Sequence, residues 1–455
     1  MKAGLPQGTR DFSAGVVKKR QYIFNNIREV FELYGYQPLE TPAFENLDTL
    51  MGKYGDEGDK LIFKILNNGL ERSEKHEQAR SDFEKILEGK NSKGITERAL
   101  KYDLTIPFAR HVAMNHAQLT MPFKRYQIQP VWRADRPQRG RYREFTQCDA
   151  DIVGSRSLLN EIELIGIYTG VFQRLGVSVQ ICINNRKILA ALAESCGGMN
   201  YMGSITIAID KLDKIGMEKV KEELSQRGLN TEQIHRITDY LNLATSQASN
   251  HNILEALKQR FADSETGREG IAELEFIFQH VPAITLDVTL ARGLNYYTGT
   301  ILEVKPLGIQ MGSIGGGGRY DDLTGLFDVP GIPGVGISFG VDRIYDVMEE
   351  LKLFPEHLYD SVTVMLVNFG TEFDQHNLAL LSRLRKAGIS CELFPDVVKF
   401  DKQLKYANKK QVPFIVLLGE DEIKEGKISV KDFRSGQQYR FSEEELMDFL
   451  LQHSA

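Results

Sequence analysis

The chain has 455 residues, and its 56 lysines and arginines against 62 aspartates and glutamates give a formal net charge of −6. This length predicts about two to four domains, and the 42% hydrophobic and 26% charged fractions exclude a wholly disordered chain. Four widely spaced cysteines argue against a disulfide framework or a structural zinc site, while the lack of a long apolar run or a signal peptide argues against a membrane protein and favours the cytoplasm.

The first third of the chain predicts a helix, a charged insertion and a hairpin. Residues 16–34 carry apolar side chains at the spacing of an amphipathic helix with one buried face. Residues 71–98 hold seven acidic and seven basic side chains around a thin apolar stripe, which predicts a solvated helical insertion on the surface. Residues 121–154 alternate short β-prone runs with an Arg-rich turn, the pattern of an antiparallel hairpin with a long basic loop.

The rest of the chain predicts one interrupted domain and one separate domain. A helix over 157–175 and a strand over 177–183 precede the helix-dominated, mostly polar residues 186–280. Because β-rich sequence resumes beyond them, we interpret 186–280 as an inserted helical subdomain. The predicted domains are 1–185 and 281–351, which together form one catalytic-type domain, the insertion 186–280, and 361–455 after a linker at 352–360.

Residues 361–455 alternate strands and helices, which indicates a small α/β domain. The predicted strands are 361–368, 389–394, 412–418 and 427–433, and the predicted helices are 372–387, 401–411 and 443–452.

The basic hairpin is the strongest chemical signal. From Met121 to Phe145 there are seven basic residues and two acidic ones in a chain that is otherwise acidic. Planar, permanently charged guanidinium groups suit a polyphosphate, and an aromatic side chain beside them suits a stacked adenine. The alternative is a solvated basic loop. The arginines lie at positions 133, 136, 139, 141 and 143.

Three further segments are weak when taken singly. Leu290 to Gly299 places an arginine before paired tyrosines on a predicted short strand, which an edge strand with aromatic packing would also explain. Gly312 to Asp321 is glycine-rich without the Lys-Ser/Thr of a phosphate loop, so its glycines indicate close backbone approach to a flat ligand. Gly336 to Arg343 is a glycine-containing strand that enters a helix.

Acidic residues occur beside these segments. Asp103 precedes Thr105, and Asp149 and Asp151 follow Gln147, so these carboxylates could bind a cationic small molecule. Structural ion pairs with the nearby arginines are the alternative. None of the nine histidines has the spacing of a metal site or of a nucleophile arrangement.

Taken together, the segments resemble the histidyl-tRNA synthetases, a family of class II aminoacyl-tRNA synthetases, over essentially the whole chain. The helix with Pro42 resembles the first, dimer-forming motif, Phe123 to Phe145 the second, and Gly336 to Arg343 the third. Leu290 to Tyr297 and Gly315 to Asp321 resemble the two histidine-pocket signatures. Asn295 departs from the family, which usually has Asp there, and residues 71–98 exceed the family's minimum.

The resemblance implies an α+β fold, in which helices flank an antiparallel sheet, with a helical insertion and a C-terminal α/β anticodon-binding-like domain. It also implies a homodimer that activates L-histidine with ATP, with magnesium on the outer phosphates and no assigned protein ligand, and passes the histidyl group to histidine tRNA. The alternative is a non-catalytic, histidine-sensing paralogue of the type of the ATP phosphoribosyltransferase regulatory subunit.

The same resemblance assigns the site residues. Arg292, Arg133 and Gln147 would be catalytic, and Arg136 and Gln138 would contact the tRNA acceptor end. The implied ATP site consists of Arg133, Asp135, Arg141, Arg143, Phe145 and Arg343. The implied histidine site consists of Asp103, Thr105, Gln147, Asp151, Arg292, Tyr296, Tyr297 and Tyr320.

Overall fold

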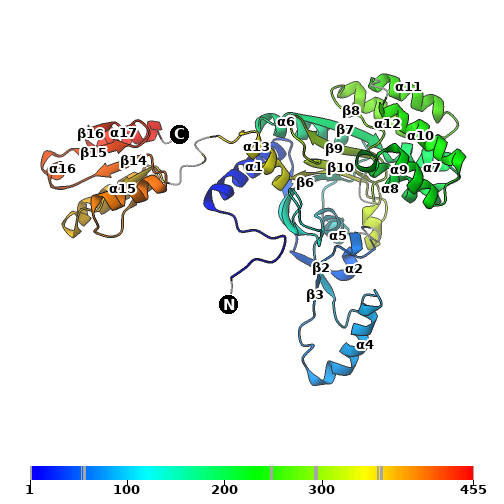
Figure 1. The fold of residues 1–455 in the computed structure, drawn as a ribbon, viewed down its shortest axis with the longest axis horizontal. Helices are drawn as coiled ribbons and strands as arrows, with labels where there is room; N and C mark the ends of the chain where they lie inside the picture. The colour runs from blue at the N-terminus through cyan, green and yellow to red at the C-terminus, as the bar shows by residue number, and fades with distance from the viewer. Residues whose placement is uncertain are drawn as a thin grey trace. The chain divides into compact units, whose positions relative to one another are not determined.

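The computed structural model describes residues 3–52, 54, 58–245, 249–291, 296–355, 358 and 362–453. The fold is α+β, as predicted (Figure 1). Two compact units divide the chain: Met1–Phe12 with Arg20–Leu353, and Phe354–Ala455 with Ser13–Lys19. Each unit is described by itself.

The first unit is built on an eight-stranded sheet in the order β1-β5-β6-β11-β10-β9-β7-β8. Only the pairs at its two ends, β1 with β5 and β7 with β8, are parallel, and all the other neighbours are antiparallel. The strands are β1 Gln37–Pro38, β5 Phe123–Trp132, β6 Glu144–Val153, β7 Val179–Asn185, β8 Thr285–Leu286, β9 Thr300–Pro306, β10 Gly315–Tyr320 and β11 Gly334–Gly340.

The predicted hairpin is confirmed as β5 and β6, which pair from Phe123 opposite Val153 to Trp132 opposite Glu144. Because alternate residues of a strand share a face, Gln147, Asp149 and Asp151 point to the same side of the sheet. The register places Gln129, Gln127 and Arg125 opposite these three residues.

The glycine-rich strand β10 lies between β9 and β11. A Cβ atom at Gly317 would come within 2.2 Å of the Gly336 carbonyl oxygen, and one at Gly318 within 2.7 Å of the Thr300 carbonyl oxygen. These two glycines therefore allow close backbone approach, but the atoms approached belong to the neighbouring strands and not to the flat ligand that the sequence predicted.

Helices α1 (Ala14–Leu33) and α6 (Leu159–Arg174) pack on one face of the sheet through aromatic side chains. The ring of Phe339 on β11 lies 5.8 Å from Phe31 of α1, 4.8 Å from Tyr168 and 5.6 Å from Phe172, both on α6. These contacts are aromatic packing of the kind that dominates protein cores. Helix α13 (Val341–Glu350) follows β11 directly.

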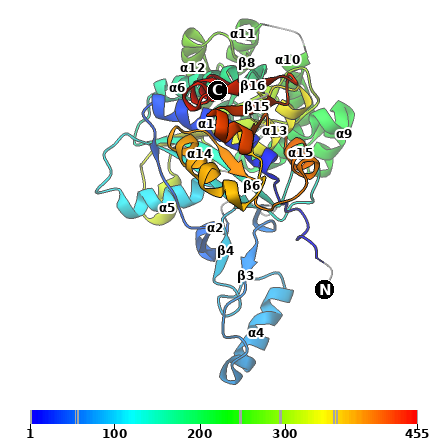
Figure 2. The ribbon, with the colours of Figure 1, turned by 90° about the vertical axis from the view of Figure 1, so that its left-hand side faces the viewer.

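A second core lies around helices α2 (Leu47–Leu50) and α5 (Thr105–Asn115) and the short 3₁₀ helix Leu323–Phe327. Beside it is a three-stranded sheet in the order β2-β4-β3, with β2 Phe44–Asn46, β4 Arg98–Leu100 and β3 Lys64–Ile65. The charged insertion contains helix α4 (His76–Leu87), which projects from this sheet away from the rest of the first unit (Figure 2). Phe83 on α4 is 50% exposed, as a thin apolar stripe on a solvated helix predicts.

Residues 186–280 are helical, as predicted. The helices are α7 Arg186–Ser195, α8 Met202–Asp210, α9 Leu212–Gln226, α10 Thr231–Thr245, α11 Asn250–Arg260 and α12 Glu265–His280. Helix α9 is kinked at Gly216, whose φ of 77° lies in a region that favours glycine. No helix in the described part of the chain is both long and apolar enough to span a membrane.

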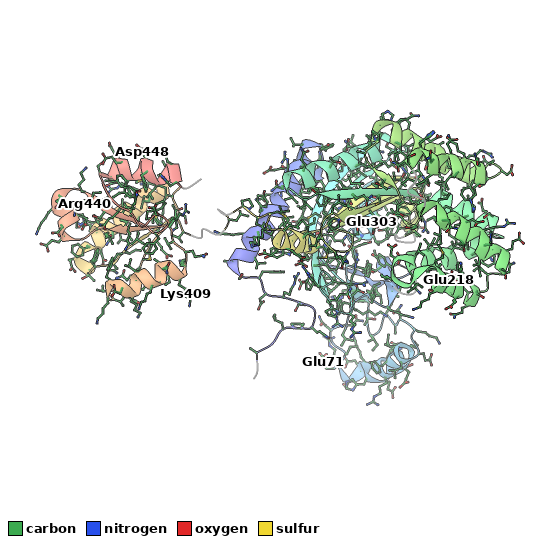
Figure 3. All side chains as sticks on the ribbon, turned by 45° about the horizontal axis from the view of Figure 1, so that its top comes forward. Glu71, Glu218, Glu303, Lys409, Arg440 and Asp448 are labelled. Carbon is green, nitrogen blue, oxygen red and sulfur yellow. The ribbon has the colours of Figure 1, made fainter. Side chains whose placement is uncertain are left out.

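The second unit contains a five-stranded sheet in the order β13-β12-β14-β15-β16. Its helices are α14 Asp374–Lys386, α15 Phe400–Lys409, α16 Glu420–Glu425 and α17 Glu443–His453, and Figure 3 labels Lys409, Arg440 and Asp448 on its surface. The strands are β12 Val364–Leu366, β13 Cys391–Leu393, β14 Phe414–Leu417, β15 Ile428–Asp432 and β16 Gln438–Phe441. The sequence did not predict α16 or β16, because one is a single short charged helix and the other a polar edge strand.

Candidate active site

Two adjoining cavities lie where β6, β10 and β11 meet in the first unit. The smaller has a volume of about 50 Å³ and the larger about 650 Å³. Both are lined by Arg133, Gln147, Gly316 and Ser338, so these residues stand at the junction. Carboxylates and tyrosines line the smaller cavity, and arginines line the larger.

The smaller cavity collects the predicted histidine-site residues that the structure describes. They are Asp103, Thr105, Gln147, Asp151, Tyr296, Tyr297 and Tyr320, from segments more than 200 residues apart in the chain. Arg292 and Asn295 lie outside the described residues. The short strand predicted within Leu290 to Gly299 is wrong in the described part of that segment, because β9 begins only at Thr300.

Asp103 is held at the start of α5. Its Oδ1 accepts hydrogen bonds from the Ile106 backbone N–H, at 3.1 Å, and from the Tyr54 hydroxyl, at 3.0 Å. Its Oδ2 accepts from the Tyr296 hydroxyl at 3.3 Å. Burial raises the pKa of Asp103, and these hydrogen bonds and Arg133 oppose the rise. The carboxyl group therefore has a fixed orientation in the cavity wall.

Asp151 pairs with a buried arginine that the sequence analysis did not identify. Arg125 lies opposite Asp151 in the hairpin, and its Nη2 is 2.8 Å from Asp151 Oδ2. The Tyr320 hydroxyl donates to Asp151 Oδ1 at 2.5 Å. Gly336 is needed here, since a Cβ atom would come within 2.0 Å of Asp151 Oδ1. The hairpin register was the signal that could have revealed Arg125.

Asp149 also lines the smaller cavity, and burial raises its pKa to about 7, while Arg125 opposes the rise. The sequence placed Asp149 near Gln147 and Asp151 without assigning it to the site. Strand alternation was the available signal, because the three residues share one face of β6.

Arg133 stands between the two cavities. Its guanidinium lies over the rings of Tyr102, at 4.3 Å, and Phe145, at 5.1 Å, and its Nε donates to the Tyr102 carbonyl at 3.1 Å. Gln147 donates to the Ser338 hydroxyl at 2.8 Å. The planar guanidinium is thus held in direct contact by neutral partners, without a carboxylate of the described residues bound to it, which suits an anion.

The larger cavity contains five of the six predicted ATP-site residues: Arg133, Asp135, Arg141, Phe145 and Arg343. Arg343 at the start of α13 donates to the carbonyls of Gly140, at 2.9 Å, and Ser313, at 2.7 Å. Arg141 pairs with Asp135 at 2.9 Å. Gln138 also lines the cavity.

Arg143 and Arg136 are not among the described residues that line either cavity. The Arg143 side chain instead packs against Gly8, and its Nε donates to the Asp135 carbonyl at 3.1 Å. Arg136 is exposed in the loop between β5 and β6.

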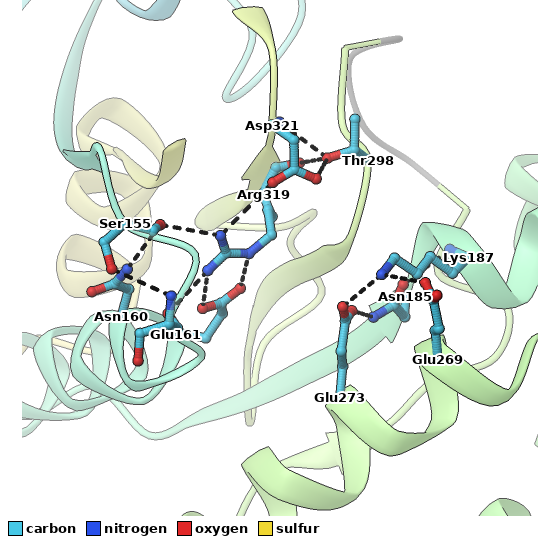
Figure 4. A network of polar contacts seen from close by, with 11 residues as sticks. Ser155, Asn160, Glu161, Asn185, Lys187, Glu269, Glu273, Thr298, Arg319 and Asp321 are labelled. Atoms are coloured by element: carbon cyan, nitrogen blue, oxygen red, sulfur yellow. Dashed lines mark hydrogen bonds and ion pairs between the residues drawn. The ribbon is translucent and has the colours of Figure 1, made fainter. Parts of the chain in front are cut away.

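A buried ion pair anchors β10, and with it Tyr320, to α6 (Figure 4). Arg319 Nε and Nη2 each donate to a carboxylate oxygen of Glu161 at 2.6 Å, and Thr298 donates to Asp321 at 2.6 Å. Because both members of the Arg319–Glu161 pair are buried, removing one would leave an uncompensated charge.

The chain is similar to known proteins over its whole length. A family model described as histidyl-tRNA synthetase matches residues 70–344, and one described as an anticodon binding domain matches 361–453. A histidine–tRNA ligase of Phocaeicola vulgatus is 51% identical over 454 residues, 98% of each chain. The crystal structure of histidyl-tRNA synthetase from Nostoc sp. PCC 7120 is 32% identical, with a TM-score of 0.81 over 100% of each chain. A protein from Bacillus halodurans, titled ATP phosphoribosyltransferase regulatory subunit/histidyl-tRNA synthetase, shares the fold. It is 20% identical, with a TM-score of 0.69 over 89% of this chain and 96% of that one.

Proposed function

Because the chain belongs to the histidyl-tRNA synthetase family, we propose that it is a histidine–tRNA ligase that activates L-histidine with ATP and transfers it to histidine tRNA. The observation that carries this proposal is the pair of adjoining cavities joined by Arg133 and Gln147. The smaller cavity, with its carboxylates, suits a small molecule with a cationic end, and the larger cavity, with its arginines, suits a polyphosphate.

Histidine would occupy the smaller cavity. Asp103 and Thr105 would hold the ammonium group, and Gln147 would hold the carboxylate side at the junction with the larger cavity. Asp151 and Tyr297 would face the two imidazole nitrogens, with Tyr320 beside them. Support comes from the burial of the Asp103 and Asp151 carboxylates. A hydrogen bond from histidine to either charged group would contribute about 1.5–3 kcal/mol to binding.

ATP would occupy the larger cavity, with adenine stacked on Phe145 and the phosphates held by Arg133, Arg141 and Arg343. An oxygen of the histidine carboxylate would attack the α-phosphorus in line, and the bond from that phosphorus to the bridging oxygen of pyrophosphate would break. Negative charge on the α-phosphoryl oxygens would be stabilised by Arg133, whose orientation is already set by Tyr102 and Phe145. A hydroxyl of the terminal tRNA ribose would then attack the acyl carbon, and AMP would leave.

The remaining residues assigned from sequence keep their proposed roles in part. Arg292 remains a proposed catalytic and histidine-site residue. Arg136, in the exposed loop, and Gln138, in the wall of the larger cavity, are proposed to meet the tRNA acceptor end. For Arg143, whose side chain packs on Gly8, we propose support of the Asp135 backbone in place of direct ATP contact.

Magnesium is expected to enter with ATP on its outer phosphates. Among the described residues, no group of three carboxylate, histidine or cysteine side chains is arranged to hold a metal ion. We therefore assign no protein ligand and no step to the ion.

The second unit is proposed to bind the anticodon. At the carboxyl end of its parallel strands, Phe369 and Phe400 stack at 6.1 Å between ring centres and are 38% and 37% exposed. Exposed aromatic rings are platforms on which unpaired bases stack, and ligands bind open α/β sheets at this edge.

A homodimer in the cytoplasm is the proposed state of the protein. Support for the dimer is the resemblance of the first helix and strand to the dimer-forming motif of the class. Support for the compartment is that the four cysteines are free thiols, three of them buried, as a reducing environment allows.

The test is histidine-dependent exchange between ATP and radiolabelled pyrophosphate, followed by charging of histidine tRNA. We expect both activities from the purified chain. A protein that binds histidine and shows neither activity would support the alternative, a histidine-sensing regulatory paralogue. The presence of Arg133 and Arg343 in the larger cavity favours the enzyme, since a sensor has no need of phosphate-binding arginines.

A further inference from the structure

The wall of the larger cavity includes a lysine from the helical insertion. Lys214 lines this cavity together with Asp210, while the arginines come from the hairpin and from α13. It lies at the start of α9, between the end of α8 and the kink at Gly216. Figure 3 labels Glu218 on the same helix, just beyond that kink.

The kink separates Lys214 from the rest of α9. The φ of 77° at Gly216 interrupts the helix, so the turn that contains Lys214 does not follow the direction of residues 217–226. That turn is tied back to the helix by Lys211, whose ammonium pairs with Glu223 at 2.7 Å. Glu223 also binds Arg227. The turn that presents Lys214 therefore has its own anchor.

Lys211 and Lys214 are one turn apart and differ in their partners. Lys211 has its carboxylate, whereas the exposed ammonium group of Lys214 makes no hydrogen bond or ion pair with any residue that the structure describes. A lysine that lines a cavity without a counter-ion offers its positive charge to a ligand.

The charges around the cavity indicate which ligand this is. Arg141 is already paired with Asp135, and Arg139 with Glu350. Of the two other carboxylates in the wall, Asp342 is paired with Arg20. Arg133, Arg343 and Lys214 therefore outnumber the remaining carboxylate, Asp210, and the wall carries an excess of positive charge. A nucleoside triphosphate brings several negative charges, and the α-phosphate is assigned above to Arg133.

We propose that Lys214 binds the β- and γ-phosphates of ATP, so that the helical insertion takes part in nucleotide binding. This inference rests on the assignment of the larger cavity to ATP. It gives the insertion a role in the first step, before tRNA is bound, and it makes Lys214 a residue that holds the leaving pyrophosphate.

The experiment compares three variants of the full chain in pyrophosphate exchange. Lys214→Ala should raise the KM for ATP about tenfold, as expected for one lost hydrogen bond to a charged group, with less than a twofold change in the KM for histidine. Lys214→Arg keeps the charge and should stay within about threefold of the wild type. Lys219→Ala removes another exposed lysine of α9 that does not line the cavity, and it should match the wild type.

Calorimetry with ATP and AMP separates this proposal from the proposed function. Lys214→Ala should weaken ATP binding about tenfold and leave AMP binding unchanged, because AMP lacks the outer phosphates. Unchanged ATP binding, equal losses for ATP and AMP, or an effect confined to the KM for tRNA would each overturn the proposal. If the wild type binds ATP but shows no histidine-dependent exchange, the ligase function fails while the calorimetric comparison still decides the role of Lys214.

Discussion

Replacing Asp103 with asparagine should separate ligand binding from folding at one position. The asparagine Oδ1 can still accept from Ile106 N–H and the Tyr54 hydroxyl, so the start of α5 should keep its hydrogen bonds. The variant loses the negative charge that we assign to the histidine ammonium, and it also loses the Oδ2 acceptor of the Tyr296 hydroxyl. A hydrogen bond to a charged group contributes about 1.5–3 kcal/mol, so histidine affinity should fall roughly 10- to 150-fold.

Replacing the same residue with alanine should also destabilise the fold. The variant loses a helix-start hydrogen bond, worth about 1 kcal/mol, and leaves the buried Tyr54 hydroxyl without its acceptor, at a cost of about 1–3 kcal/mol. We therefore expect a lower melting temperature for Asp103→Ala than for Asp103→Asn, with weak histidine binding in both.

The assay is calorimetric titration with histidine and with ATP, together with thermal unfolding of the same preparations. Ser264→Ala is the matched control, because Ser264 accepts from Gly267 N–H at the start of α12 and lines neither cavity. It should lose about 1 kcal/mol of stability and bind histidine normally. Wild-type histidine affinity in Asp103→Asn would refute the assignment of the ammonium site.

Three other outcomes are expected. Arg133→Lys should lower turnover in pyrophosphate exchange by ~10²–10³, because a point charge cannot reproduce a planar guanidinium held between two rings, and wild-type turnover would contradict its catalytic role. Asp149 has a folded-state pKa of about 7, above its value in the unfolded chain, so the stability it contributes is full at low pH and is lost as the pH rises through 7. Between pH 5 and 8 the free energy of unfolding of the wild type should therefore fall by up to about 3 kcal/mol relative to that of Asp149→Asn, as denaturant titrations would measure. Parallel dependences of the unfolding free energy on pH in the two proteins would argue against the raised pKa. Phe369→Ala should raise the KM for tRNA about tenfold, because one stacking contact is lost, and should leave pyrophosphate exchange unchanged. An unchanged KM for tRNA would show that Phe369 does not belong to the tRNA-binding surface.

Local pattern determined much of this protein. The helix over residues 14–33, the hairpin of β5 and β6, and the helical insertion follow from periodicity and from turn residues, because these features depend on neighbours close in the chain. Strand alternation could also have placed Gln147, Asp149 and Asp151 on one face. The recognition of the family depended on the order of several segments, each weak by itself.

Only the tertiary structure decided which of these residues meet. Asp103, Tyr297 and Tyr320 reach one cavity from three separate segments, and no local pattern encodes that convergence. Whether an arginine faces a ligand or a neighbour is likewise a matter of packing: Arg133 lines the junction, whereas Arg143, from the same basic run, packs on Gly8. Contacts between residues distant in the chain depend on how the sheets and helices pack, and for that reason the part that Lys214 plays in the cavity wall emerged from the fold alone.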